Sequence, residues 1–217
     1  MILRTFNGGY DRNFCYVLIN DESEEKETII IDPFEDSRIT ELIEKDKLKV
    51  LYIINTHSHH DHVSGNKSLK EKTKAKIVMN EHSSLEFDKK VRDAEELLIN
   101  GFKIKFIYTP GHIPDGMCVL VNDLLLFTGD LLFVGKVGGT GPRFKGSDPK
   151  LEWESLQKLM KLNENILVYP GHDYGKKPSS SIKNEKKTNP FLLCKTYEEF
   201  IDLKNNWHVY KKENLEN

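Results

Sequence analysis

The chain has 217 residues, and a content of 38% hydrophobic and 30% charged residues is ordinary for a soluble globular protein and argues against disorder. A formal net charge of -2 argues against a general electrostatic attraction to nucleic acid or to an anionic membrane. The sequence has no apolar run long enough to span a membrane, no signal-peptide pattern at its start and no CxxC pair among its three cysteines, so we expect a cytoplasmic protein.

The first half of the chain alternates between strand-like and helix-like patterns. Short runs rich in β-branched and aromatic residues predict strands over 14–19, 28–32, 50–55 and 76–80. Helical patterns occupy 37–47 and 65–73. No repeat or Pro/Gly/Ser linker interrupts this order, so we expect one main domain.

The second half adds four more strand-like runs and two helices. The predicted strands cover 102–108, 117–122, 124–129 and 166–170. Helical patterns cover 150–162 and 197–211, and Thr196 with Glu199 forms a capping box before the second of them. Strand hairpins mixed with helices indicate layered α/β sheets rather than one all-parallel sheet.

Four polar clusters follow directly after predicted strands. They are THSHHDH after 50–55, TPGH after 102–108, TGD after 124–128 and YPGH after 166–169. Strand ends that lie side by side gather such loops at one edge of the sheets. We therefore expect these four clusters to meet.

The residue types in these clusters are those of a metal site. The spacing His57-x-His59-x-Asp61-His62 does not suit one face of a helix, because positions two apart point about 200° from one another, whereas a loop can bring them together. Imidazole nitrogen and carboxylate oxygen are ligands of zinc and similar divalent ions. The remaining candidate ligands are His112, Asp130 and His172. We assign His60, His82 and His208 to surface or packing roles.

At this point the sequence resembles a known family. HxHxDH, TPGH, FTGD and PGHDY, in this order, resemble the metallo-β-lactamase fold superfamily, in particular its hydroxyacylglutathione hydrolase (glyoxalase II) branch. The resemblance runs from about residue 10 to 175. It implies an α/β fold, a four-layer αβ/βα sandwich with a short C-terminal helical extension. Residues 1–175 would form the catalytic domain, and residues 176–217 would form the extension packed on it.

The resemblance also implies a site for two divalent metal ions. We expect zinc, with iron and manganese as the other candidates. His57, His59 and His112 would hold the first ion, and Asp61, His62 and His172 the second, with Asp130 bridging both. Asp32, after the strand 28–32, would fix the surrounding loops. Asp61 and Asp130 are the residues that we predict to be catalytic.

The expected reaction is the hydrolysis of a thioester. A water shared by two cations has a pKa near neutrality and attacks a carbonyl carbon, while the cations stabilise the oxyanion. A thiolate leaves without a proton, whereas an amine must first be protonated, and the sequence offers no obvious dedicated acid. This favours a thioester of the hydroxyacylglutathione type over a β-lactam.

The substrate side departs from the glyoxalase II pattern. The segment KVGGTGPRFKG, residues 136–146, replaces that family's glutathione-holding segment, and residues 173–217 are too few for its full helical substrate domain. Lys136, Arg143 and Tyr174 are the candidate substrate-binding residues. The expected partner is a small-molecule thioester, with no nucleic acid and no membrane.

The same fold also supports functions other than thioester hydrolysis. A persulfide dioxygenase would hold one iron through His57, His112 and Asp130, and it retains the remaining ligand positions, so the motif alone does not separate it from a hydrolase. Nucleic-acid processing is disfavoured because there is no basic excess. A non-catalytic binding module is disfavoured because all seven ligand positions are intact.

Overall fold

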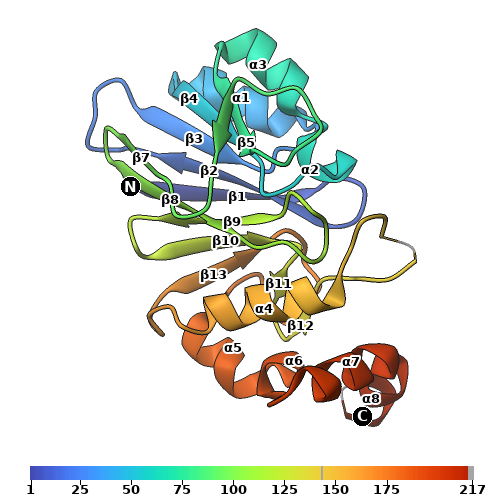
Figure 1. Cartoon of the computed structure of the whole chain (residues 1–217). Coiled ribbons are helices and arrows are strands. Elements are labelled where there is room, and N and C mark those ends of the chain that lie inside the picture. The colour runs from blue at the N-terminus through green and yellow to red at the C-terminus, as the bar shows by residue number, and fades with distance from the viewer. Residues whose placement is uncertain (143, 215–217) are drawn as a thin grey trace.

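Two six-stranded sheets face one another in the computed structural model, which describes residues 1–142 and 144–214 (Figure 1). The first sheet has its strands in chain order: β1 (Ile2–Gly8), β2 (Asn13–Ile19), β3 (Glu27–Ile31), β4 (Lys49–Ile54), β5 (Lys76–Asn80) and β6 (Lys89–Val91). Strands β1 to β3 are antiparallel, and β3 to β6 are parallel. Every residue of β2 and β3 is buried, as expected for strands covered on both faces.

The second sheet is built around an antiparallel meander. Its order is β14 (Ser180–Ser181), β13 (Leu167–Pro170), β10 (Leu125–Gly129), β9 (Met117–Val121), β8 (Phe102–Tyr108) and β7 (Glu96–Ile99). Strand β13 runs parallel to β10, so the loops that follow these two strands leave the sheet at the same edge. A separate hairpin follows β10 and consists of β11 (Leu132–Phe133) and β12 (Lys136–Val137).

Three apolar cores hold these layers together. The central core lies between the sheets and includes Tyr16, Phe106 and Phe127, all of which are buried. A second core joins the outer face of the first sheet to α1 (Ser37–Asp46) and α3 (Asn66–Thr73). The third joins the outer face of the second sheet to α4 (Pro149–Leu159) and to the C-terminal helices. This arrangement confirms the four-layer αβ/βα sandwich.

Within the part of the chain that the structure describes, four short helices follow β14. They are α5 (Ile182–Thr188), α6 (Pro190–Leu193), α7 (Tyr197–Asn205) and α8 (Trp207–Asn214). Ile182, Phe191 and Phe200 carry them into the third core, which agrees with the C-terminal helical extension that was expected. Among the described residues no helix is long and apolar enough to cross a membrane.

The prediction of one continuous helix over 197–211 is wrong. The helix breaks at Asn206, where the backbone leaves helical geometry at φ -104° and ψ 15°. Asparagine is a poor helix former because its side chain competes for backbone groups, and the Asn206 amide donates to the Asp202 carbonyl at 3.1 Å. The predicted capping box is confirmed in part: the Thr196 hydroxyl accepts a hydrogen bond from the Glu199 N–H, but the Glu199 carboxylate accepts from the Lys195 N–H at 2.7 Å rather than from that of Thr196.

The other predicted elements lie within a few residues of their expected positions. The eight predicted strands correspond to β2, β3, β4, β5, β8, β9, β10 and β13. The sequence patterns missed β1, whose residues are mostly half-buried, and the short strands β6, β7, β11, β12 and β14. These strands are too short or too exposed to show a clear alternation of apolar and polar residues. The sequence patterns also missed α2 (His60–Val63) within the histidine-rich loop.

Candidate metal centre

The seven candidate ligands come together at one edge of the sandwich, at the ends of strands from both sheets. His57 and His59 follow β4, and Asp61 and His62 lie on the single turn α2. The others follow three strands of the second sheet: His112 after β8, Asp130 after β10 and His172 after β13. The strand-end reasoning therefore holds for all four polar clusters.

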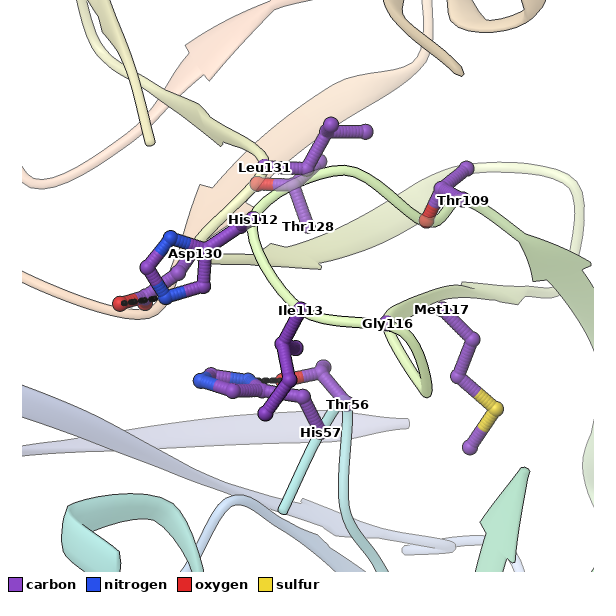
Figure 2. A pocket seen from close by; sticks show the side chains of 10 residues that line it. All are labelled: Thr56, His57, Thr109, His112, Ile113, Gly116, Met117, Thr128, Asp130 and Leu131. Atoms are coloured by element: carbon purple, nitrogen blue, oxygen red, sulfur yellow. Dashed lines mark hydrogen bonds and ion pairs between the residues drawn. The ribbon is translucent and has the colours of Figure 1, made fainter. Parts of the chain in front are cut away.

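One group of ligand atoms comprises His57, His59, His112 and Asp130, and these atoms all lie within 4.8 Å of one another. The Nδ1 atom of His59 is 3.0 Å from Nε2 of His57 and 3.1 Å from Nε2 of His112. Asp130 Oδ2 is 3.6 Å from Nε2 of His112. Figure 2 shows His57 and His112 approaching from opposite sides, with Asp130 beside His112.

A second group comprises Asp61, His62 and His172, with the same limit of 4.8 Å between ligand atoms. Nε2 of His62 and Nε2 of His172 are 3.1 Å apart, and Asp61 Oδ2 is 3.4 Å from His172 Nε2. Asp130 also reaches this group, because its two oxygens lie 3.3 Å from Nε2 of His62 and of His172. The Asp130 carboxylate therefore stands between the two groups.

In four of the histidines, Nδ1 lies against a hydrogen-bonding oxygen, so that Nε2 is the ring nitrogen that faces the centre. Nδ1 of His112 lies 2.7 Å from the Gly139 carbonyl, and Nδ1 of His172 lies 2.8 Å from the Asp11 carbonyl. Nδ1 of His62 lies 3.1 Å from an Asp32 oxygen. A carbonyl or carboxylate can only accept, so each Nδ1 carries a proton, and in the neutral imidazole each Nε2 presents a lone pair.

For His57, the acceptor at Nδ1 is the hydroxyl of Thr56. The Thr56 hydroxyl donates its one proton to Asp32 at 2.6 Å, so it accepts from Nδ1 of His57 at 3.1 Å. Asp32 also accepts from the Thr56 N–H at 2.7 Å. One buried carboxylate thus orients ligands of both groups, as expected for the residue that fixes the surrounding loops.

The donor set fits divalent metal ions. Nε2 of His62 and Nε2 of His172 lie 3.1 Å apart, and when both imidazoles are neutral their facing lone pairs repel unless a cation lies against them. The Asp130 Oδ1 atom is buried and accepts no hydrogen bond from the described residues. Five imidazoles and two carboxylates are the ligand types that zinc, iron and manganese share.

Burial and the neighbouring carboxylates shift the pKa values of the histidines in opposite directions. Burial lowers the pKa of His57 well below its usual value, and it also lowers the pKa of His112. Burial acts in the same direction on His62, but Asp130 and Asp32 outweigh it and raise its pKa. For Asp130, burial is outweighed by His62 and His172, so its pKa is well below the usual range.

The loop between β1 and β2 and the first residue of β2 contribute supporting side chains that the sequence reasoning missed. The Asn13 side-chain amide donates to Asp61 Oδ2 at 2.8 Å, and the Asn13 backbone bridges to His172. The Asp11 carboxylate accepts from the Tyr174 hydroxyl. The only available signal was the turn-rich segment NGGYDRN before a strand, which does not indicate what its side chains contact.

Two glycines allow close backbone approach behind the centre. A Cβ on Gly138 would lie 1.9 Å from the Asp130 carbonyl oxygen, and one on Gly111 would lie 2.3 Å from the Glu152 Cα. Gly111 also has a φ of 144°. No larger side chain fits at either position without displacing a ligand-bearing loop.

A buried ion pair supports these same loops from the C-terminal helices. Lys204 of α7 contacts Glu152 of α4 and donates to the Gly138 carbonyl at 2.8 Å. The next residue, Gly139, supplies the carbonyl that orients His112. Burial raises the pKa of Glu152 to about 7, although Lys204 acts against this shift. No local sequence pattern indicates this pair, because the partners lie on helices far apart in the chain.

The predicted substrate-side residues are placed as follows. Tyr174 stacks on His172, with ring centroids 4.7 Å apart and an interplanar angle of 7°. The Lys136 ammonium donates to the Tyr174 carbonyl at 2.7 Å. Arg143 lies outside the described residues. His60, His82 and His208 are exposed and belong to neither group of ligand atoms, as expected.

An open hollow of about 860 Å³ lies over the centre. Its lining includes His59, Asp61, His112, Asp130 and His172. The lining also includes the aromatic residues Tyr10, Phe34, Phe144 and Tyr174. The arrangement can admit a small molecule with an apolar part to the converging ligand atoms.

This fold and this cluster of ligands define a metal-dependent enzyme built on an αβ/βα sandwich, and comparison with known proteins identifies its family. The model of the metallo-beta-lactamase superfamily matches residues 8–172, and the chain belongs to that superfamily. A divalent-metal site made of His and Asp side chains fits its members.

Three curated relatives are similar over most of the chain. A probable polyketide biosynthesis zinc-dependent hydrolase, BaeB, from Bacillus velezensis is 32% identical over 204 residues, which is 89% of this chain and 87% of that protein. The mitochondrial persulfide dioxygenase ETHE1 of Mus musculus is 30% identical over 94% of this chain and 82% of its own length. A hydroxyacylglutathione hydrolase of Francisella tularensis subsp. novicida is 35% identical over 80% of this chain and 68% of its own.

The solved structure of ETHE1 from Myxococcus xanthus is also similar. It superposes with a TM-score of 0.87 at 30% identity, and the match covers 95% of this chain and 91% of that one. Similarity to both hydrolases and dioxygenases leaves the glyoxalase II branch as one of at least two related branches.

Proposed function

We propose that the protein is a metal-dependent hydrolase that cleaves thioesters of the hydroxyacylglutathione type. The observation that carries the proposal is the completeness of both ligand groups, joined by Asp130 at 3.3 Å from His62 and His172. The similar hydrolases named above support it. In this proposal residues 1–175 form the catalytic domain, and residues 176–217 form the packed extension.

Seven residues would hold two divalent ions, for which zinc is the first candidate. Bound to these residues, such ions supply a water of lowered pKa and positive charge for the developing oxyanion. His57, His59 and His112 would hold the first ion, and Asp61, His62 and His172 the second. Asp130 would serve both.

The side chains of the protein would orient the substrate and receive the proton of the attacking water. Asp61 is fixed by Asn13, and its side chain is 26% exposed to the hollow, so it can accept the proton that the attacking water gives up. The water oxygen bonds to the acyl carbon as the carbon–sulfur bond breaks, and the sulfur leaves as a thiolate. Tyr174 and Lys136, with Arg143, would contact the thiol half of the substrate.

A second candidate function is the oxidation of a persulfide at one iron ion. The similarity to the Myxococcus xanthus ETHE1 structure favours it, together with the identity to the mouse persulfide dioxygenase. His57, His112 and Asp130 would then form a facial triad. The remaining four ligands would be retained without a second ion.

Metal analysis combined with two assays tests the proposal. The hydrolase is expected to bind about two metal ions per chain and to release free thiol from S-D-lactoylglutathione or another acyl thioester. One iron per chain, with oxygen uptake on glutathione persulfide and no thioester cleavage, would establish the dioxygenase instead.

A further inference from the structure

A second cavity lies beside the metal centre, on the side of the C-terminal helices. Its volume is about 690 Å³, which is within the usual range of small-molecule sites. It is enclosed by the β11–β12 hairpin, the segment after His172, β14 with the start of α5, and one residue of α8. We call it the lysine cavity and define it by Lys136, Tyr174, Lys176, Lys177, Ser180 and Lys211.

The lining of the lysine cavity is rich in lysine side chains. Its described lining residues include four lysines and neither aspartate nor glutamate. Within residues 1–142 and 144–214, neither Lys176 nor Lys177 forms an ion pair with a carboxylate. Burial lowers the pKa of Lys136, and the charges of Lys211 and Arg12 act in the same direction. An anion in the cavity would relieve this repulsion.

The cavity adjoins the metal centre through a single aromatic residue. Tyr174 lines both the lysine cavity and the hollow over the metal ligands. Its ring is held in place by stacking on His172 and by the hydrogen bond of its hydroxyl to Asp11. His172 stacks on the ring and the Arg12 guanidinium lies over it, 5.0 Å from its centroid, so a molecule seated among the lysines would pass beside the edge of Tyr174 to reach the ligand atoms.

We propose that the lysine cavity binds the phosphate groups of the thiol carrier in a thioester of the coenzyme A type, while the acyl end lies at the metal centre. This inference rests on the proposed thioester hydrolysis and specifies its thiol half. Lysine ammonium groups bind phosphate as point charges, and the Ser181 hydroxyl, which accepts from the Asn184 N–H, keeps its own proton to donate. Glutathione carries an ammonium group, and none of the described lining residues has a carboxylate to receive it.

The first test is binding, measured by calorimetry on the metal-loaded protein with S-methyl coenzyme A and S-methylglutathione. Their thioethers remove thiolate coordination from the comparison. Coenzyme A is expected to bind more tightly, and the exposed pair Lys176→Glu with Lys177→Glu should weaken its binding by about tenfold or more, because two charge-assisted contacts are lost. The control pair Lys45→Glu with Lys161→Glu makes the same charge change away from the cavity and should leave binding unchanged.

The second test compares acetyl-coenzyme A with S-acetyl-N-acetylcysteamine, which has the same acyl group and no phosphate. The Lys176 and Lys177 substitutions should raise KM about tenfold for acetyl-coenzyme A only. The inference is overturned if both thioethers bind equally, or if the substitutions leave coenzyme A binding intact. Cleavage of the cysteamine thioester without coenzyme A binding also overturns it, while the hydrolase function stands. Charge-dependent coenzyme A binding without cleavage of any thioester supports the cavity and contradicts the hydrolase.

Discussion

Replacing Lys204 with methionine should destabilise the protein in a pH-dependent way. Glu152 is fully buried, its Oε1 atom accepts no hydrogen bond from the described residues, and its Oε2 atom accepts from Lys204. Methionine keeps the apolar stem of the side chain but removes the ammonium. Both carboxylate oxygens then lie buried and unpaired, and removal of one partner of such a pair costs about 3–5 kcal/mol.

The loss should grow as the pH rises. With Lys204 present, burial raises the pKa of Glu152 to about 7, above its ordinary value of 4.5. Removing Lys204 removes a charge that lowers this pKa, so the folded variant holds its proton to still higher pH. The unfolded chain releases that proton near pH 4.5, so both proteins lose stability as the pH rises above this value, but only the variant still loses it above about pH 7, where Glu152 of the unsubstituted protein ionises in the folded state. We therefore expect the loss caused by the substitution to be larger at about pH 8 than at about pH 5.5, by about 1 kcal/mol.

Urea unfolding at both pH values measures these differences, with a chelator present so that metal binding does not contribute. The double variant Lys204→Met with Glu152→Gln removes the unpaired charge and should recover most of the loss at the higher pH. A loss below about 1 kcal/mol at the higher pH, or an equal loss at both, would refute the reasoning. Metal retention should also weaken in the single variant, because Lys204 holds the Gly138 carbonyl next to the one that orients His112.

Three other predictions follow from the site and the cores. Asp130→Ala should abolish thioester cleavage and lower the bound metal per chain with an unchanged circular dichroism spectrum; unchanged turnover would contradict the bridging role. Gly138→Ala should reduce metal retention, because its Cβ would overlap the Asp130 carbonyl, whereas Gly135→Ala, with nothing within 4 Å, should cost only about 1 kcal/mol of backbone strain. A disulfide reagent at neutral pH should modify only half-buried Cys194 in the native protein, because burial raises the thiol pKa of Cys118 to about 12; rapid modification of all three cysteines would contradict this.

Much of the fold was readable from local patterns. The apolar runs of β2 and β3 are buried on both faces, and such runs are distinct in sequence from the solvated helices α1 and α3. Elements without such an apolar run could not be predicted from the sequence. Strand β1 is largely half-exposed, and the break at Asn206 depends on a hydrogen bond to Asp202 rather than on any change in apolar spacing.

The convergence of the ligands was also determined by the sequence, because each polar cluster stands directly after a strand. Strand ends meet at one edge once the sheets form, so His57, His112, Asp130 and His172 could be assigned to one site from the sequence alone. Spacing alone did not separate a hydrolase from a dioxygenase. Both chemistries use overlapping subsets of the same side chains, and their difference lies in the metal and the substrate.

Only the tertiary structure decided how those ligands are oriented and what lies around them. The imidazole protons are placed by acceptors distant in the chain: Asp32 for His62, the Asp11 carbonyl for His172 and the Gly139 carbonyl for His112. The lysine cavity likewise joins separate segments of the chain. Local sequence sets which residues form a strand or a loop, but hydrogen bonds and charges between distant segments exist only once the layers pack, so the orientation of the site comes from the fold.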